Sequence, residues 1–278
     1  MRRFHLHLVS DSTGETLESV AKAVLAQFAD VSALKHFWPM VRSARQMDRV
    51  MDEIAARPGV VLYTLVDETI RDVLLTRAES AQLPTISVLD PVIQAMATYL
   101  GVEAAGVAGR QHRMDAAYFE RIDAMHYTLA HDDGQLSNFL TEADIILVGV
   151  SRTSKTPTSI YLANRGYKTA NVPLVPNCPI PDQLLAIRNE DTGPMVVGLT
   201  TSPDRLSEIR KNRLRSLAED KSLDYADIDK VREEVQFARR LCAQRGWPVI
   251  DVTRRSIEET AAAVLNHYNQ RVEPGPAQ

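Results

Sequence analysis

An apolar run that passes directly into a polar, lysine-containing loop sets the strongest constraint on the fold of this chain. Residues 144–150, DIILVGV, have the length and composition of a buried central strand, and the segment after the loop favours a helix. Strands joined to helices by short loops are the units of a parallel sheet. Further apolar runs with the same rhythm occupy residues 4–9, 59–66, 85–89, 194–200 and 248–252.

This alternation of strands and helices predicts an α/β fold with mostly parallel sheets and flanking helices. The charged stretch 203–245, which separates the last two apolar runs, is expected to form two helices. Two pairs with capping-box spacing, Ser12 with Glu15 and Ser256 with Glu259, predict helix starts near the first strand and after the last one.

A Gly- and Ala-rich segment followed by a polar stretch interrupts this rhythm near the middle of the chain. The interruption predicts two domains with a linking region between them. The predicted parts are an N-terminal α/β domain at 1–105, a connecting segment at 106–143, a P-loop kinase-like domain at 144–272 and a flexible tail at 273–278.

The loop after the central strand reads G-x-x-x-x-S-K-T, which is close to the phosphate-binding pattern G-x-x-x-x-G-K-[ST]. Backbone N–H groups of such a loop face a phosphate, and the helix that follows adds its dipole. We expect Lys155 to reach the terminal phosphates and the Thr156 hydroxyl to take a place on Mg2+. The predicted nucleotide-binding residues are Gly149, Val150, Ser151, Arg152, Thr153, Ser154, Lys155 and Thr156.

Ser154 departs from the general pattern, in which this position is a glycine. If the loop requires a positive φ here, a serine would be strained by about 1 kcal/mol. The alternative to a phosphate site is a plain strand-to-helix turn with a solvated lysine.

Three other polar segments are each open to two interpretations. Residues 10–16, SDSTGET, fit either a second anion site, with Asp11 as a base, or a helix cap. Residues 131–134, HDDG, fit either a base or metal carboxylate at Asp132 or an acidic turn. The basic residues of 205–215 fit either a lid over phosphates or a solvated helix face.

Three aspartates at the ends of apolar runs are candidates for Mg2+ ligands, bases or caps: Asp67, Asp90 and Asp251.

Composition narrows the class of protein. The formal net charge of -4 does not favour a nucleic-acid partner. The two cysteines are too few for a disulfide framework and indicate a reducing compartment. No segment has the roughly 20 apolar residues of a membrane span, and the N-terminus does not have the pattern of a signal peptide. A cytoplasmic enzyme with no membrane or nucleic-acid partner is therefore expected.

The residues around the loop resemble one family. The run GVSRTSKTPTSIYLANRGYKTANVPLVP at 149–176 closely resembles the pyruvate, phosphate dikinase regulatory proteins and their phosphoenolpyruvate synthase relatives. The segments VSDSTGET at 9–16 and HDDG at 131–134 look like the same family, so the resemblance spans nearly the whole chain. Ser154 belongs to the family's own form of the loop.

This resemblance implies a bifunctional enzyme. One activity is a Ser/Thr protein kinase that uses ADP to phosphorylate a threonine beside the catalytic histidine of the dikinase, which inactivates it. The other removes that phosphate with inorganic phosphate as acceptor and releases pyrophosphate. The family's ADP site maps onto Gly149 to Thr156, and Lys155, Thr156, Asp11 and Asp132 are the predicted catalytic residues.

The target and the class of activity stay open at this point. The loop and the following IYLANRG favour pyruvate, phosphate dikinase over phosphoenolpyruvate synthase as the protein substrate. The alternatives are a small-molecule P-loop kinase that uses ATP, and a non-catalytic nucleotide-sensing regulator. In the main hypothesis the substrate threonine enters between the two halves of the chain, and a homodimer would be an ordinary assembly.

Overall fold

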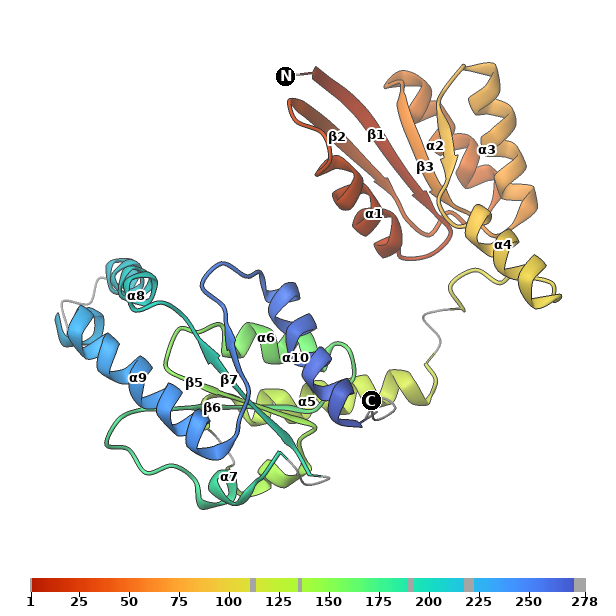
Figure 1. Ribbon diagram of the computed structural model, residues 1–278. Helices are drawn as coiled ribbons and strands as arrows, with labels where there is room; N and C mark the ends of the chain where they lie inside the picture. Colours follow the sequence, from red (N-terminus) through yellow and green to blue (C-terminus); the bar gives the residue numbers. More distant parts are fainter. Residues whose placement is uncertain (1, 111–113, 135–136, 190–192, 218–222, 273–278) are drawn as a thin grey trace. The chain divides into compact units, whose positions relative to one another are not determined.

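The chain divides into two compact units, residues 1–113 and 114–278. The computed structural model describes residues 2–110, 114–134, 137–189, 193–217 and 223–272 (Figure 1). Within this part of the chain, no helix is both long and apolar enough to cross a membrane.

The predicted connecting segment 106–143 is not a separate part, because the unit boundary falls inside it. Its helix α5 (Ala116–Ala130) packs against α6 (Lys155–Ala163) and β6 (Thr169–Pro173) of the C-terminal unit. The predicted tail 273–278 lies outside the described residues.

The N-terminal unit is a four-stranded parallel sheet in the order β2-β1-β3-β4. Side chains of β1 and β3 pack against α2 and α3 on one face and against α1 on the other. The elements are β1 (Arg2–Ser10), α1 (Glu15–Leu25), β2 (Val31–Trp38), α2 (Ala44–Ala56), β3 (Gly59–Thr64), α3 (Glu68–Ser80), β4 (Thr85–Ser87) and α4 (Asp90–Leu100).

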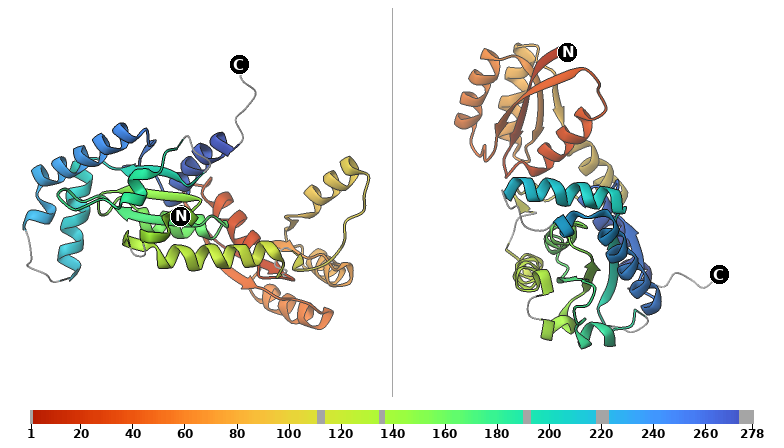
Figure 2. Two further views of the ribbon diagram at one scale, coloured as in Figure 1. Left: turned by 90° about the horizontal axis from the view of Figure 1, so that it is seen from below. Right: turned by 90° about the vertical axis from the view of Figure 1, so that its left-hand side faces the viewer.

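The C-terminal unit repeats this plan with the strand order β6-β5-β7-β8, again fully parallel. One face of the sheet packs against α9, and the other packs against α6 and α10. Helices α8 and α9 lie side by side (Figures 1 and 2). The remaining elements are β5 (Ile145–Gly149), α7 (Asp182–Ala186), β7 (Met195–Thr200), α8 (Pro203–Leu217), α9 (Ile228–Arg245), β8 (Val249–Asp251) and α10 (Ile257–Val272).

The predicted fold class is confirmed, and every predicted strand is present. Two strands were missed. The first, β2, is an edge strand with Ser, Lys and His in its sequence, and β6 contains Asn171 and Pro173, so neither has the apolar run of a central strand. The two helices expected in 203–245 are α8 and α9.

The two capping-box predictions have opposite outcomes. At α10, Glu259 N donates to Ser256 Oγ (3.1 Å) and Ser256 N donates to the Glu259 carboxylate (2.8 Å), as predicted. At α1 the prediction is wrong, because Gly14 (φ 81°) is the N-cap and no side chain caps the helix. Ser12 instead lies in the loop, where its N–H donates to Ser10 Oγ (3.1 Å).

Strand order also locates the points where ligands bind in parallel sheets. The chain leaves β1 for β2 on one side and later returns to β3 on the other, and β5 has the same relation to β6 and β7. In open α/β sheets, ligands bind beyond the carboxyl ends of the strands at such a reversal. The loops after β1 and β5, both singled out from the sequence, lie at these two positions.

A buried histidine links β1 to its neighbours in the N-terminal unit. His7 is fully buried, its Nε2 donates to Arg57 O (2.8 Å), and Trp38 Nε1 donates to its Nδ1 (3.3 Å). Both ring nitrogens are therefore satisfied only in the neutral form. Burial lowers the pKa of His7 below its usual value, and the nearby His36 and His5 add repulsion in the same direction.

We expect the N-terminal unit to lose stability as the pH falls. The unfolded chain protonates His7 near its usual pKa of about 6.5, whereas the folded unit resists the proton, so stability is highest above that pH and decreases below it. Unfolding by urea between pH 7.5 and 5.5, followed by Trp38 fluorescence in a Trp247→Phe background, measures this. His7→Gln should show a smaller decrease, and equal slopes would contradict the role of His7.

Candidate functional site

The loop after β5 begins with a turn that only glycine can make. Gly149 has φ 150°, and a Cβ at this position would lie 2.3 Å from Leu199 O on the neighbouring strand. The loop closes on itself through Thr153, whose Oγ1 donates to Val150 O (2.9 Å). Strand β5 is buried over its whole length, so this turn starts from a fixed point in the sheet.

The serine that departs from the general pattern has the backbone conformation of a glycine. Ser154 lies in the left-handed region (φ 60°, ψ 22°), and Arg152 also has a positive φ of 73°. The strain expected at Ser154, about 1 kcal/mol, is therefore present in the fold. Ser154 is also the N-cap of α6, and its carbonyl accepts the N–H of Thr158 (3.1 Å).

Lys155 is held inside the loop. Its side chain is 5% exposed, and its Nζ donates to Val150 O (2.9 Å). An ammonium group has three protons, so two remain for other acceptors. Burial lowers the pKa of Lys155 to about 8, although the carboxylates of Asp133 and Asp132 oppose this shift.

Thr156, Asp132 and Asn171 form a hydrogen-bonded triangle at the start of α6. Thr156 Oγ1 donates to Asp132 Oδ1 (3.0 Å), and Asn171 Nδ2 donates to Asp132 Oδ1 (2.5 Å) and to Thr156 Oγ1 (3.0 Å). Asp132 lies in a short 3-10 turn (Asp132–Gly134), and Asn171 lies on β6. The structure thus brings together two predicted residues and one that was missed.

Asn171 was missed because β6 was not recognised as a strand. Its only signal in the sequence is a polar residue between Ala170 and Val172 in a short segment after the loop helix. The side chain is 1% exposed, and its Oδ1 has no hydrogen-bond partner among the described residues. A buried amide that is half satisfied is costly, and the Oδ1 of Asn171 can still accept a hydrogen bond from a water or a ligand.

The HDDG segment has features of both predictions, an acidic turn and a carboxylate at a candidate site. Asp133 adopts a left-handed turn conformation (φ 52°), as an acidic turn would, while the Asp132 carboxylate points at Thr156. His131 is buried, stacks on Tyr127 with 3.9 Å between ring centroids, and donates from Nδ1 to Tyr127 O (2.7 Å). These contacts fix the turn, and the buried Nε2 of His131 has no hydrogen-bond partner among the described residues.

Asp11 lies in the other unit, after β1. It is buried, and its Oδ2 accepts the N–H of Val66 (2.7 Å). Burial raises the pKa of Asp11 above its usual value. Its role as a base stays a prediction.

The three aspartates at strand ends have local partners. Asp67 caps α3 through Ile70 N (3.1 Å), Asp90 faces Arg71 (3.6 Å), and Asp251 accepts from Thr253 N (2.8 Å). These contacts agree with the interpretation of Asp67 and Asp251 as caps.

The arginines of helix α8 are exposed apart from Arg210. Arg205 pairs with Glu208 on the surface, whereas Arg210 is 1% exposed. Arg210 makes a bidentate pair with Glu234 of α9 (2.6 and 3.1 Å) and donates to Ser151 O of the loop (3.3 Å). Its guanidinium also lies over the Tyr225 ring, 4.5 Å from the centroid. Arg210 therefore links α8 and α9 to the backbone of the loop after β5.

A parallel α/β sheet with a phosphate-type loop, a lysine and a threonine–aspartate pair at its switch point is the architecture of an α/β phosphotransferase. The chain belongs to the family described as Kinase/pyrophosphorylase, which matches residues 6–265. The family expected from the sequence is thus confirmed, and with it the general class of the enzyme.

Curated relatives from three bacteria match over almost the whole chain, and each is named as a candidate pyruvate, phosphate dikinase regulatory protein. The relative from Novosphingobium aromaticivorans is 58% identical over 99% of this chain and 97% of its own length. The relative from Rhizorhabdus wittichii is 58% identical over 98% of this chain and 97% of its own length. The relative from Bradyrhizobium diazoefficiens is 53% identical over 99% of this chain and 98% of its own length. A solved sugar-binding transport protein from Agrobacterium vitis aligns over 92% of this chain and 98% of its own with a TM-score of 0.26 and 14% identity, which is too distant for any inference.

Removing the buried arginine should destabilise the C-terminal unit. Arg210→Met leaves the Glu234 carboxylate without its main partner and the Ser151 carbonyl without a donor, and breaking a buried ion pair in this way costs about 3–5 kcal/mol. Urea unfolding followed by Trp247 fluorescence in a Trp38→Phe background measures the loss. Arg205→Met on the same helix removes an exposed pair and should change the free energy of unfolding by less than about 1 kcal/mol. Similar effects of the two changes would contradict the support role of Arg210.

Proposed function

We propose that this chain is a bifunctional regulator that phosphorylates a protein threonine with ADP as donor and removes the same phosphate with inorganic phosphate as acceptor. The observation that carries this proposal is the hydrogen bond from Thr156 to the Asp132 carboxylate (3.0 Å). Thr156 follows Lys155, whose ammonium group donates to Val150 O in the same loop. Membership of the Kinase/pyrophosphorylase family supports both directions of transfer.

The donor set at the start of α6 fits Mg2+. The Thr156 hydroxyl and the Asp132 carboxylate are hard oxygen ligands, and Mg2+ in phosphoryl-transfer sites is bound by one or two such groups together with phosphates and water. A bound magnesium ion would neutralise charge on the transferring phosphoryl group. Asp132 then acts on the metal side of the site, and Asn171 positions both Asp132 and Thr156.

In the kinase direction, the residues of this chain bind and orient the donor. Backbone N–H groups of the loop and the Lys155 ammonium hold the α- and β-phosphates, and the substrate hydroxyl attacks the β-phosphorus. The bond between the two phosphates breaks and AMP leaves, while the hydroxyl proton passes to a base or to water. In the dephosphorylation direction, an oxygen of inorganic phosphate attacks the phosphorus of the phosphothreonine. The bond between phosphorus and the threonine oxygen breaks, the threonine oxygen takes up a proton, and pyrophosphate leaves. Electrostatic stabilisation of the phosphoryl oxygens supplies most of the rate.

The names of the relatives favour pyruvate, phosphate dikinase over phosphoenolpyruvate synthase as the protein substrate. A cytoplasmic location is proposed with it. Both cysteines, Cys178 and Cys242, are free, which is compatible with a reducing compartment.

The decisive experiment uses purified dikinase, Mg2+ and ADP labelled in the β-phosphate. Lys155→Ala and Asn171→Ala should lower transfer to the dikinase by about 10²–10³-fold, because each removes a group that orients or stabilises the transferring phosphoryl. Both should also lower the release of pyrophosphate from the phosphorylated dikinase. Arg165→Ala, at an exposed position just after the end of α6, should leave both activities unchanged.

Unchanged transfer in Lys155→Ala would rule out this site. Transfer from ATP to a small molecule, with none to the dikinase, would indicate the small-molecule kinase. Tight binding of ADP without any transfer would indicate the non-catalytic sensor.

The pH dependence of nucleotide binding should report the lysine. Because burial lowers the pKa of Lys155 to about 8, the free loop loses its ammonium charge above that pH. ADP affinity should be constant near pH 7 and decrease above pH 8, approaching tenfold per pH unit. Isothermal titration calorimetry between pH 7 and 9 measures this. Lys155→Arg keeps its charge over this range and should show a flatter profile. A constant affinity in the unsubstituted protein would contradict the role of the charge.

A further inference from the structure

Strand β2 forms an open edge of the N-terminal sheet. It pairs with β1 along eight residues, from Val31 to Trp38, and within the described part of the chain no strand lies on its other side. The register with β1 is continuous, so no bulge turns the outer edge away. Alternate backbone N–H and C=O groups of such an edge face outward, and an extended peptide can pair with them as a further strand.

Apolar side chains lie along one face of this edge strand. Trp38 packs against the core that α2 shares with β1 and β3. Leu34, four residues earlier, points to the same face because side chains of a strand alternate, and it is 48% exposed. A strand added at this edge would place every second side chain beside Leu34 and Trp38.

A cavity at the carboxyl end of β2 suits one large side chain of such a strand. Its volume is about 260 Å³, which is below the range of small-molecule sites, about 300–1,000 Å³. Trp38, Pro39, Val41 and Val50 supply apolar walls, and Arg49 supplies a charge beside them. This combination favours an apolar side chain that has an acidic neighbour.

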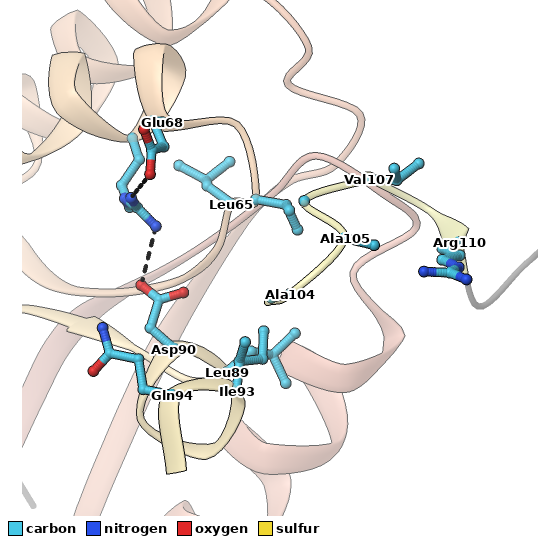
Figure 3. Close-up of a pocket in the computed structure, with 13 residues that line it drawn as sticks. Leu65, Glu68, Leu89, Asp90, Ile93, Gln94, Ala104, Ala105, Val107 and Arg110 are labelled. Atoms are coloured by element: carbon cyan, nitrogen blue, oxygen red, sulfur yellow. Dashed lines mark hydrogen bonds and ion pairs between the residues drawn. The ribbon is translucent and has the colours of Figure 1, made fainter. Parts of the chain in front are cut away.

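Two other cavities of this unit lie near the ends of β1 and β3. Figure 3 shows the larger one, where Leu65 and Ile93 face the segment 104–107. None of the residues that line these two cavities belongs to β2 or α2. The cavity at Trp38 is therefore a separate feature of the edge strand.

The surface beside this edge carries an excess of positive charge. The acidic side chains of α2 are all paired with arginines outside the helix: Asp48 and Asp52 with Arg77, and Glu53 with Arg57. Arg45 and Arg49, one helical turn apart and exposed, have no ion pair with a described residue. Lys35 adds an exposed charge on β2 itself. An acidic partner complements this surface.

We propose that the edge of β2 binds an extended acidic segment of a partner protein, which adds to the sheet as a further strand and places one large apolar side chain in the cavity at Trp38. Acidic side chains of the segment meet Lys35, Arg45 and Arg49. Backbone hydrogen bonds supply affinity, while the cavity and the basic side chains select the sequence. The surface belongs to residues 1–113 and does not include the loop at Gly149 to Thr156, so this inference does not rest on the proposed function.

Fluorescence anisotropy with the full chain and a labelled octapeptide of sequence EVEVEFEE tests the proposal. The peptide should bind with a Kd below about 1 mM at physiological ionic strength. Replacing its phenylalanine by alanine should weaken binding at least about tenfold, because the cavity is then left unfilled. The peptide KVKVKFKK, which has the same apolar pattern and the opposite charge, should not bind.

Charge reversal on the protein tests the position of the site. Arg49→Glu should weaken binding of the acidic peptide at least about tenfold. Lys22→Glu makes the same change of charge at an exposed position of α1, on the other face of the sheet, and should leave binding unchanged. The double variant Arg45→Glu/Arg49→Glu should bind KVKVKFKK more tightly than the unsubstituted chain does, a gain that loss of folding would not produce.

Peptides N-methylated at alternate amides test the addition of a strand. Only one of the two alternating sets of N–H groups would face β2, because the other set of an added strand faces away from the sheet. Methylation of one set should therefore abolish binding, and methylation of the other set should preserve it.

Three results would overturn the proposal: no binding of EVEVEFEE up to about 1 mM, equal effects of Arg49→Glu and Lys22→Glu, or equal effects of the two N-methylated sets. Peptide binding that is lost as the chain self-associates in sedimentation velocity would assign the edge to a second copy instead. Phosphoryl transfer by the loop is measured separately, so the proposed function can stand where this inference fails.

Discussion

The close contact between Gly149 and the Leu199 carbonyl is the constraint on which the shape of the loop after β5 depends. A side chain at this position would collide with the neighbouring strand at 2.3 Å, so only glycine lets the chain leave β5 at this angle. The turn places Val150 O where both Thr153 and Lys155 donate to it. Loop shape, the position of the lysine and the start of α6 thus follow from one backbone contact between two buried strands.

The charged side chains around the loop come from several parts of the chain. Arg210 and Glu234 come from α8 and α9 and support Ser151 from behind, while Asp132 and Asp133 come from the segment before β5. Burial lowers the pKa of Lys155, and the carboxylates of the two aspartates partly offset this decrease. The pKa of this lysine is therefore about 8, well below the ordinary value of about 10.4 for an amine.

The two units follow one plan with different chemistry. Each has a first strand flanked on both sides by later strands, and a polar loop at the carboxyl end of that strand. In the C-terminal unit this loop contains a lysine and meets a carboxylate, a hydroxyl and an amide. In the N-terminal unit it contains hydroxyls and a buried aspartate beside two cavities. Equivalent positions in the two sheets therefore present two distinct polar sites.

The sequence by itself determined the fold class, the strands with apolar runs, the helix start at Ser256 and the loop at Gly149 to Thr156, because each has a local cause in residue type and spacing. It did not determine β2 and β6, whose polar residues hide the strand period, nor the start of α1, where Gly14 replaces the expected cap. Only the tertiary structure decided that Asn171 meets Asp132 and Thr156, and that Arg210 is buried against Glu234. These contacts join residues 15 to 39 positions apart, and only the parallel sheet and the packing of α8 on α9 bring them within hydrogen-bonding distance.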